Sequence, residues 1–262
     1  MRRLCLLLSL AVLLPVRAQL PQATLNWVFP PGGAAGSTLE ITVAGSDLDD
    51  PAGLHFSDPR IIATPKPGSP LQFQAIIPPD MDEGIVDVRF AGRFGISNPR
   101  AFAIGTRPEI IAPGTNTSVQ MAFDLPLETT VNARAIANAF AWFRFDAKAG
   151  ERMILRAEAR ALDSRLVPNL FVVDGAGREL AVARRQEWLA FEAPAAASYF
   201  VKLSDQIFRG GEEYPFRLTL TTSPHLEFAV PMILRAGETN CITVYGRHLP
   251  GGEPSPVLGS DR

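Results

Sequence analysis

Cysteine, histidine and net charge are all scarce in this sequence of 262 residues, and each shortage excludes a class of protein. The two cysteines, Cys5 and Cys241, cannot supply the disulfide framework that stabilises many small secreted folds. The three histidines, His55, His225 and His248, lie far apart in sequence and lack the paired spacing of a zinc site. The 25 basic residues nearly balance the 27 acidic ones, so the charge pattern excludes nucleic acid as a partner.

The sequence does contain enough apolar material for a packed core. Hydrophobic residues make up 47% of the chain and charged residues 20%, which excludes an intrinsically disordered protein. The length fits one to two domains. The 21 glycines and 23 prolines provide many turns but fall short of a low-complexity linker.

The N-terminus has the pattern of a secretory signal peptide. Arg2 and Arg3 precede an apolar run at residues 4–14, and Ala18 ends a short segment suited to cleavage. The run is too short to span a bilayer as a helix, so we favour export over a short membrane anchor and expect no transmembrane segment in the mature chain. The expected destination is the periplasm, the cell surface or the extracellular space.

Much of the remaining sequence alternates apolar and polar residues with a period of two. The clearest segments are residues 39–43, 86–90, 153–160 and 216–221. Such alternation buries one face of a strand and leaves the other in water, as in antiparallel sheets packed face to face. Turn residues separate these segments at the spacing of β-sandwiches. We therefore predict an all-β fold of tandem antiparallel β-sandwiches.

One stretch competes with this interpretation. Ala133, Ile136, Ala137 and Phe140 have the spacing of one helical face. The segment that follows, residues 142–145, alternates like a strand, so we favour strand structure here as well.

An internal repeat is the most informative feature. Residues 25–30 (LNWVFP) match residues 226–231 (LEFAVP), and the match continues without a gap. The further matched pairs, each 201 positions apart, are Gly36 and Gly237, Thr38 and Thr239, Ile41 and Ile242, Thr42 and Thr243, Val43 and Val244, Gly45 and Gly246, and Leu48 and Leu249. Such a repeat indicates duplicated modules. The second copy has 37 residues, too few to close a sandwich, so we expect the N-terminal part of a longer architecture or a truncated gene.

The first copy of the repeat resembles a known module. Residues 27–33 (WVFPPGG), Gly36 and residues 43–48 (VAGSDL) resemble the opening of the immunoglobulin-like (IPT/TIG-like) modules of large secreted planctomycete-type proteins. Residues 87–89 (DVR) and 95–102 (GISNPRAF) are similar to the end of that module.

The next segment resembles a bacterial pre-peptidase C-terminal domain. The residues that carry this resemblance are 142–145 (WFRF), 149–151 (AGE), 158–160 (EAR), 164–166 (SRL), 174–180 (DGAGREL), 199–203 (YFVKL), 210–212 (GGE) and 214–218 (YPFRL). The resemblance implies a non-catalytic β-sandwich that accompanies secreted peptidases and other surface proteins and aids localisation, substrate attachment or secretion. Some relatives bind calcium through Asp-x-Asp-Trp-Phe, but Ala139 and Ala141 replace both acids here, which argues against calcium at this place.

Together the patterns and the resemblances predict five segments, the last of which is a truncated third module. They are a signal peptide (1–18), an immunoglobulin-like β-sandwich (22–106), a linker (107–118), a pre-peptidase C-terminal-like, jelly-roll-like β-sandwich (119–223) and an incomplete repeat of the first module (224–262).

No catalytic, cofactor-binding or metal-ligating residue is predicted. The sequence has no Gly-x-Ser-x-Gly elbow, and Ser97, whose surroundings come nearest, is followed by Pro99 and is predicted to be a turn residue. The acidic segments 47–50 and 80–84 could offer oxygens to a calcium ion, but they lack calcium-loop spacing, so we favour solvated turns. Asn116 begins a formal glycosylation sequon, to which we assign no role.

Three tryptophans and sixteen phenylalanines suggest a surface for stacking on sugars. Trp142 lies on an alternating aromatic strand and is predicted to fill the space between sheets. Trp188 follows the charged residues Arg184, Arg185 and Glu187, so it is the residue that we predict to contact a ligand.

The favoured hypothesis is a secreted or cell-surface, non-catalytic β-sandwich protein that acts as an interaction or spacer module. One alternative is the non-catalytic N-terminal part of a secreted hydrolase or peptidase. A second alternative is a carbohydrate-binding module. The sequence leaves open whether the partner is a surface protein or a polysaccharide.

Overall fold

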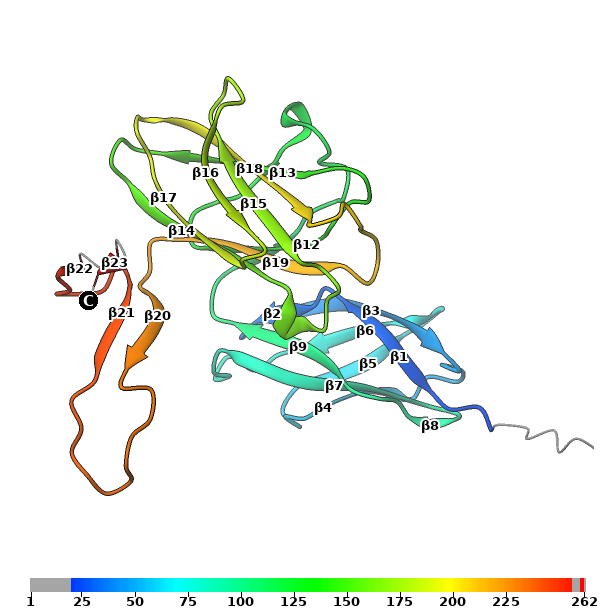
Figure 1. Cartoon of the computed structure of the whole chain (residues 1–262). Helices are drawn as coiled ribbons and strands as arrows, with labels where there is room; N and C mark the ends of the chain where they lie inside the picture. Colours follow the sequence, from blue (N-terminus) through cyan, green and yellow to red (C-terminus); the bar gives the residue numbers. More distant parts are fainter. Residues whose placement is uncertain (1–19, 256–259, 262) are drawn as a thin grey trace, which may run out of the picture.

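The computed structural model describes residues 20–255 and 260–261 (Figure 1). The predicted signal peptide, with Cys5 and Ala18, lies outside the described residues. Within them, strands joined by turns make up nearly all of the regular structure, so the all-β prediction is confirmed. No helix in this part of the chain is long and apolar enough to cross a membrane.

The first module is a sandwich made from one sheet. Its strands are β1 (Thr24–Phe29), β2 (Gly32–Ala34), β3 (Thr38–Ser46), β4 (Gly53–Phe56), β5 (Ile62–Lys66), β6 (Ser69–Ile76), β7 (Gly84–Gly92), β8 (Gly95–Ile96) and β9 (Arg100–Gly105). They are ordered β1-β3-β6-β5-β4-β7-β9-β2, with β8 paired to β7. The sheet folds over between β5 and β4, where Leu54 pairs with Ala63, and the two halves become the two layers. Pairing is antiparallel except between β2 and β9.

The core of the first module lies between these two layers. Ile41 of β3 and Phe73 of β6 are fully buried on one side, and Phe90 of β7 and Phe102 of β9 are fully buried on the other. The rings of Phe73 and Phe90 meet edge to face at 6.2 Å between centroids. Because Ile41 and Phe90 occupy apolar positions of the alternating segments, the period-two pattern identifies the buried face correctly here.

The second module is a sandwich of two five-stranded sheets. Its elements are β10 (Glu109–Ile111), η1 (Val119–Met121), β11 (Phe123–Asp124), β12 (Thr129–Arg134), β13 (Ala141–Ala147), β14 (Arg152–Glu158), η2 (Arg160–Leu162), β15 (Pro168–Val173), β16 (Glu179–Arg184), β17 (Trp188–Glu192), β18 (Ala197–Asp205) and β19 (Pro215–Thr221). One sheet has the order β10-β12-β19-β14-β17 and the other β11-β13-β18-β15-β16. Strand β10 lies within the residues that were expected to form a linker, and it pairs with β12 in parallel.

Aromatic rings fill the space between the two sheets. Phe143 of β13 meets Phe216 of β19 edge to face at 6.1 Å between centroids. Trp142, however, points to the outer face of its sheet and is only half-buried, so the prediction that it fills the core is wrong. The alternation along β13 gives the inner face to Phe143 and thereby turns its neighbour outward. Ala133 lies on β12, so the strand interpretation of this region is confirmed over the helical one.

The third segment forms a small sheet beside the second module (Figure 1). Its strands are β20 (His225–Val230), β21 (Thr243–Arg247), β22 (Pro254–Ser255) and β23 (Ser260–Asp261), in the order β20-β21-β23-β22. Leu226 pairs with Gly246 just before a bulge, as Leu25 pairs with Gly45 just before the bulge in β1. The β20–β21 and β1–β3 pairs therefore share one register. The duplication of a whole module stays a prediction.

Candidate functional site

The outer face of the sheet β10-β12-β19-β14-β17 is polar in sequence and buried in the structure. On β19, Phe216 and Leu218 point into the core, so alternation turns Arg217 and Thr219 outward. The period-two pattern predicted a wet outer face, and for β19 this is wrong, because every residue of the strand is buried. The first module covers one part of this face and the third segment another (Figure 1). We call this outer face the junction face.

Arg217 lies at the centre of the junction face between two glutamates. Its side chain is 6% exposed and that of Glu109 is 8% exposed, and the two form an ion pair through Nη2 and Oε1. Arg217 Nη1 donates to Glu158 Oε2 at 3.0 Å. Glu109 also accepts from Asn132 Nδ2 at 2.7 Å, and Glu158 accepts from Arg156 Nη2 at 2.7 Å. Removing one member of such a pair leaves a buried charge without its partner, which is strongly destabilising.

The first module covers Arg217 with glycine backbone. Gly32 of β2 and Gly105 at the end of β9 both lie directly against the guanidinium. A β-carbon on Gly32 would lie 2.8 Å from Arg217 Nε, and one on Gly105 would lie 2.6 Å from both Arg217 Nη2 and Glu109 Oε1. Because β-carbons do not approach other atoms so closely, the two modules meet over the buried arginine only where side chains are absent.

Arg134 makes a second bridge between the modules. From the end of β12 its guanidinium carbon lies 3.8 Å from the ring centroid of Phe29 and 4.8 Å from that of Trp27, both on β1. The indole Nε1 of Trp27 donates to Glu212 Oε2 of the second module at 3.1 Å. Burial lowers the pKa of Arg134, and the charge of Glu212 opposes that shift. A desolvated cation held against two rings stabilises the contact between the modules.

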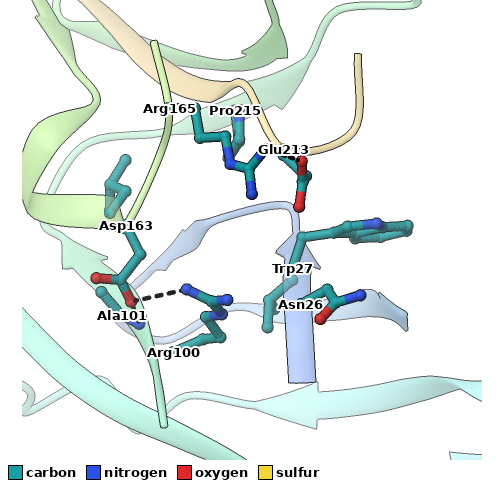
Figure 2. A pocket seen from close by; sticks show the side chains of 10 residues that line it. Asn26, Trp27, Arg100, Ala101, Asp163, Arg165, Glu213 and Pro215 are labelled. Carbon is teal, nitrogen blue, oxygen red and sulfur yellow. Dashed lines mark hydrogen bonds and ion pairs between the residues drawn. The ribbon is translucent and has the colours of Figure 1, made fainter. Parts of the chain in front are cut away.

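A polar pocket of about 160 Å³ lies at one side of this contact (Figure 2). From the second module, Asp163 accepts the backbone N–H of Ala101 at 2.9 Å, and its carboxylate lies 4.0 Å from Arg100 Nη1. Across the pocket Arg165 pairs with Glu213 at 2.8 Å. Each arginine that lines the pocket therefore already faces a carboxylate, which favours a structural role for these charges over the binding of a charged ligand.

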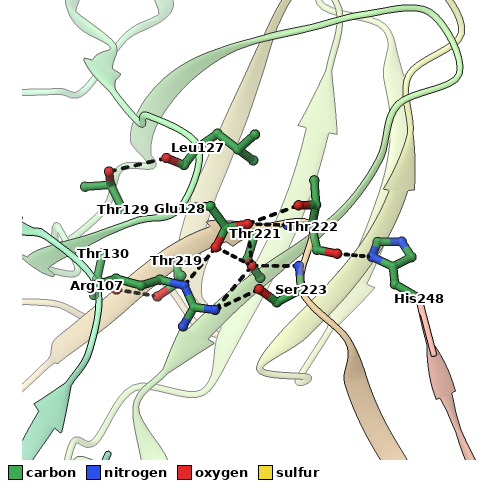
Figure 3. A network of polar contacts seen from close by, with 10 residues as sticks. All are labelled: Arg107, Leu127, Glu128, Thr129, Thr130, Thr219, Thr221, Thr222, Ser223 and His248. Atoms are coloured by element: carbon green, nitrogen blue, oxygen red, sulfur yellow. Dashed lines mark hydrogen bonds and ion pairs between the residues drawn. The ribbon is translucent and has the colours of Figure 1, made fainter. Parts of the chain in front are cut away.

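Glu128 ties together the two connections that enter and leave the second module (Figure 3). Its carboxylate accepts from Arg107 Nε at 2.9 Å, from the backbone N–H of Thr222 at 2.7 Å and from Thr221 Oγ1 at 2.8 Å. Burial by itself raises the pKa of Glu128, but these hydrogen bonds outweigh it and hold the pKa at about 2. His248 Nδ1 of the third segment lies 3.0 Å from the carbonyl oxygen of Thr222.

Trp188, the predicted ligand contact, lies on β17 at the edge of the junction face. Its half-buried ring lies 4.7 Å from the ring of His225 between centroids, and the guanidinium carbon of Arg247 lies 5.9 Å from it. Both neighbours belong to the third segment, so within the described chain this ring contacts another part of the same molecule. Burial lowers the pKa of His225.

The other polar residues singled out from the sequence do not gather at one place. Ser97 is buried, and its hydroxyl donates to the carbonyl oxygen of Asn98 at 2.7 Å, as suits a structural residue. Asn116 of the sequon is also buried, and its amide donates to a backbone carbonyl of β13 at 2.8 Å. His55 and Cys241 are exposed and lie on different parts of the chain.

The two acidic segments lie in exposed turns of the first module. Asp80 pairs with Arg60 at 3.2 Å, and Asp50 lies 3.9 Å from Arg93. Among the described residues, no three His, Cys, Asp or Glu side chains come together in a way that could hold a metal ion.

The sequence analysis did not find Arg217, Arg134 or Glu109. Arg217 occupies a polar position of an alternating strand, where a charge normally faces water, and Glu109 lies in the predicted linker. The available signal was a charge at the middle of a long apolar segment, which marks a buried partner only if a second module covers that face.

No protein-family model matches this chain, and no curated protein matches it significantly. Among solved structures, it is similar to the pre-peptidase C-terminal domain of a collagenase from Bacillus anthracis, with 11% identity, a TM-score of 0.31, and coverage of 44% of this chain and 99% of that one. PliG, a periplasmic inhibitor of g-type lysozyme from Aeromonas hydrophila, is similar at 13% identity and a TM-score of 0.30, over 43% of this chain and 98% of that one. SGBP-B of a mixed-linkage glucan utilisation locus of Bacteroides ovatus is similar at 10% identity and a TM-score of 0.26, over 77% of this chain and 46% of that one.

Proposed function

We propose that this protein is an exported, non-catalytic spacer and interaction protein whose modules are held in one orientation. The observation that carries the proposal is the position of Arg217. This arginine is 5% exposed, is paired with two glutamates of its own module, and is covered by Gly32 and Gly105 of the other.

Short connections support the same proposal. Residues 106–108 alone join β9 to β10, and residues 222–224 alone join β19 to β20. A flexible arrangement of domains normally relies on a longer polar linker and a small, wet interface. Here each connection is held by Glu128, and the junction face is buried under both neighbouring parts of the chain.

The proposed role is mechanical and does not require a reacting group. The charged side chains of the junction serve one another: Arg217 and Arg165 each have a glutamate partner, and the lowered pKa of Glu128 keeps that carboxylate ionised for its hydrogen bonds. A general acid or base needs a pKa near the working pH, which this carboxylate lacks. Partner choice would then lie on the outer surfaces that the rigid arrangement presents.

Small-angle X-ray scattering of the mature protein at low and high salt tests this function. Because the central ion pair is buried, salt screens it weakly, so the expected radius of gyration is the same in both conditions and matches that of the compact arrangement in Figure 1. A radius that grows with salt, or a scattering curve typical of modules on a flexible tether, would overturn the proposal.

A further inference from the structure

The outer face of the second module's other sheet, β11-β13-β18-β15-β16, lies away from the first module (Figure 1). The strand registers place Trp142, Lys202, Phe171 and Val182 in one row across four strands. Outward positions of a sheet that borders water are normally polar. This row is mostly aromatic and aliphatic, and no other module packs on it within the described part of the chain.

Phe140 gathers the rings of this face into a cluster. It meets Phe171 edge to face at 5.8 Å and Phe208 at 5.2 Å between centroids. The Nζ of Lys202 lies 5.1 Å from the centroid of Phe140 and 4.7 Å from that of Phe171. Phe208 stays 40% exposed, although phenylalanine is among the residues most often buried.

The turn that presents Phe208 is held in place from beneath. Asp205 is buried, and its carboxylate accepts the backbone N–H groups of Ile207 at 3.0 Å and Arg209 at 3.3 Å. Phe208 has a φ of 57°, in the left-handed region that a bulky side chain rarely occupies. Residues kept in such conformations cluster at binding sites, where the surrounding structure compensates for their cost.

A shallow groove of about 400 Å³ lies beside these rings. Its lining includes Phe140, Phe171, Phe208, Arg184, Arg185 and Ser204, and we call it the aromatic groove. No carboxylate lines the groove, and neither arginine has an ion-pair partner among the residues that the structure describes.

Ser204 is the second observation that points to a ligand. The residue is 1% exposed, and its hydroxyl has no hydrogen-bond partner in the described structure. A buried hydroxyl without a partner costs free energy, which a ligand that supplies an acceptor or donor would recover. Ser204 lies opposite Asn169 in the pairing of β18 with β15, so two polar side chains neighbour each other in the groove.

We propose that the aromatic groove binds an anionic polysaccharide. The exposed face of Phe208 offers a platform for the apolar face of a sugar ring, and Arg184 and Arg185 offer forked donors to its carboxylate or sulfate groups. The formal net charge of the chain is −2, so the attraction comes from these two arginines rather than from the protein as a whole. This site rests on the interaction role proposed above, yet its loss would leave the rigid arrangement of the modules unchanged.

Native gel electrophoresis of the mature protein through polygalacturonate, dextran sulfate or neutral dextran tests this proposal. We expect retardation by at least one polyanion and none by dextran. Retardation by polygalacturonate alone identifies carboxylate as the recognised group, by dextran sulfate alone sulfate, and by both a general preference for anionic sugars. No retardation by either polyanion, or equal retardation by dextran, would overturn the proposal.

Two variants locate the site. Arg184→Gln with Arg185→Gln should weaken binding about tenfold, because two charge-assisted contacts are lost. Phe208→Gly should also weaken it about tenfold, yet leave the melting temperature unchanged or raise it, because glycine tolerates a φ of 57°. If either variant binds as tightly as the wild type, the groove is not the site.

The first module offers a matched control. Arg93 lies over the ring of Phe94 at 5.7 Å, the same distance that separates Arg184 from the ring of Phe171. Arg93→Gln with Phe94→Ala removes one charge and one ring from the surface elsewhere. We expect it to bind like the wild type, and an equal loss of binding would mean that general surface charge, not the groove, attracts the polyanion.

Discussion

The guanidinium of Arg217, on a central strand of the second module, packs against the α-carbon of Gly105, the last residue of a strand in the first module. A β-carbon on Gly105 would lie 2.6 Å from Arg217 Nη2, so the contact exists only because this residue has no side chain. It joins a buried charge network to the edge of a neighbouring sheet. This is how two sandwiches with separate cores become one rigid unit.

Breaking the ion pair of Arg217 should be costly. Glu109→Ala leaves the guanidinium with one glutamate and little water, so we expect a loss of about 3–5 kcal/mol in the free energy of unfolding, measured by urea denaturation. Glu40→Ala is the control, since Glu40 pairs with Lys66 on the exposed surface, where such a pair contributes about 0–1 kcal/mol. Equal losses in the two variants would contradict the account.

The aromatic bridge should contribute separately. Trp27→Leu removes one ring from Arg134 and the hydrogen bond to Glu212, and we expect a loss of about 1–2 kcal/mol by thermal denaturation. Phe94→Leu removes a ring from the exposed Arg93 and should cost about 0.5 kcal/mol or less. A Trp27 variant as stable as the wild type would show that this contact does not hold the modules.

Glu128 should make the stability depend on acid pH. Its pKa falls from an ordinary 4.5 to about 2 on folding, so its contribution is complete above pH 4.5 and is lost as the pH falls toward 2. The side chain is 40% exposed, and solvent screening limits the effect to about 1 kcal/mol. Urea denaturation from pH 6 to 2 should therefore show a steeper loss in the wild type than in Glu128→Gln. Parallel profiles would contradict this prediction.

The matched glycines at the two bulges should differ in their importance. A β-carbon on Gly45 would lie 1.8 Å from the carbonyl oxygen of Thr24, and one on Gly246 would lie 2.0 Å from that of His225. Gly45→Ala should lower the free energy of unfolding of the first module by about 3 kcal/mol, because backbone must move next to a packed core. Gly246→Ala should leave the main calorimetric transition in place and disturb only the third segment. A main transition equally lowered by both variants would show that the third segment shares the core's cooperativity.

Local sequence patterns account for much of the fold. Strand positions and their buried faces follow from period-two alternation in segments such as residues 39–43 and 86–90, because each module's core depends on that alternation alone. The 201-position offset correctly relates Leu25 and Gly45 to Leu226 and Gly246, because the same bulge requires the same glycine.

The site could not be predicted in the same way. Alternation shows which side of β19 leaves its own core but not that a second module covers that side, so Arg217 reads as a solvated charge. Trp142 was assigned to the core because aromatic residues usually lie there, whereas register places it outside beside Lys202. Both errors have one cause: contacts between distant segments leave no periodic trace in a single sequence.

The rigid junction is tested most directly by a distance measured between the modules. In a Cys241→Ser background, the exposed residues Thr64 and Lys148 are changed to cysteine and spin-labelled, one on each module, and the distance distribution is recorded by pulsed electron paramagnetic resonance. The account predicts one narrow distribution, broadened by Gly105→Ala but not by Gly84→Ala, whose β-carbon would meet no atom within 4 Å. Circular dichroism verifies that the sheets persist in each variant. A broad distribution in the parent protein, or one that Gly105→Ala leaves unchanged, would contradict the account.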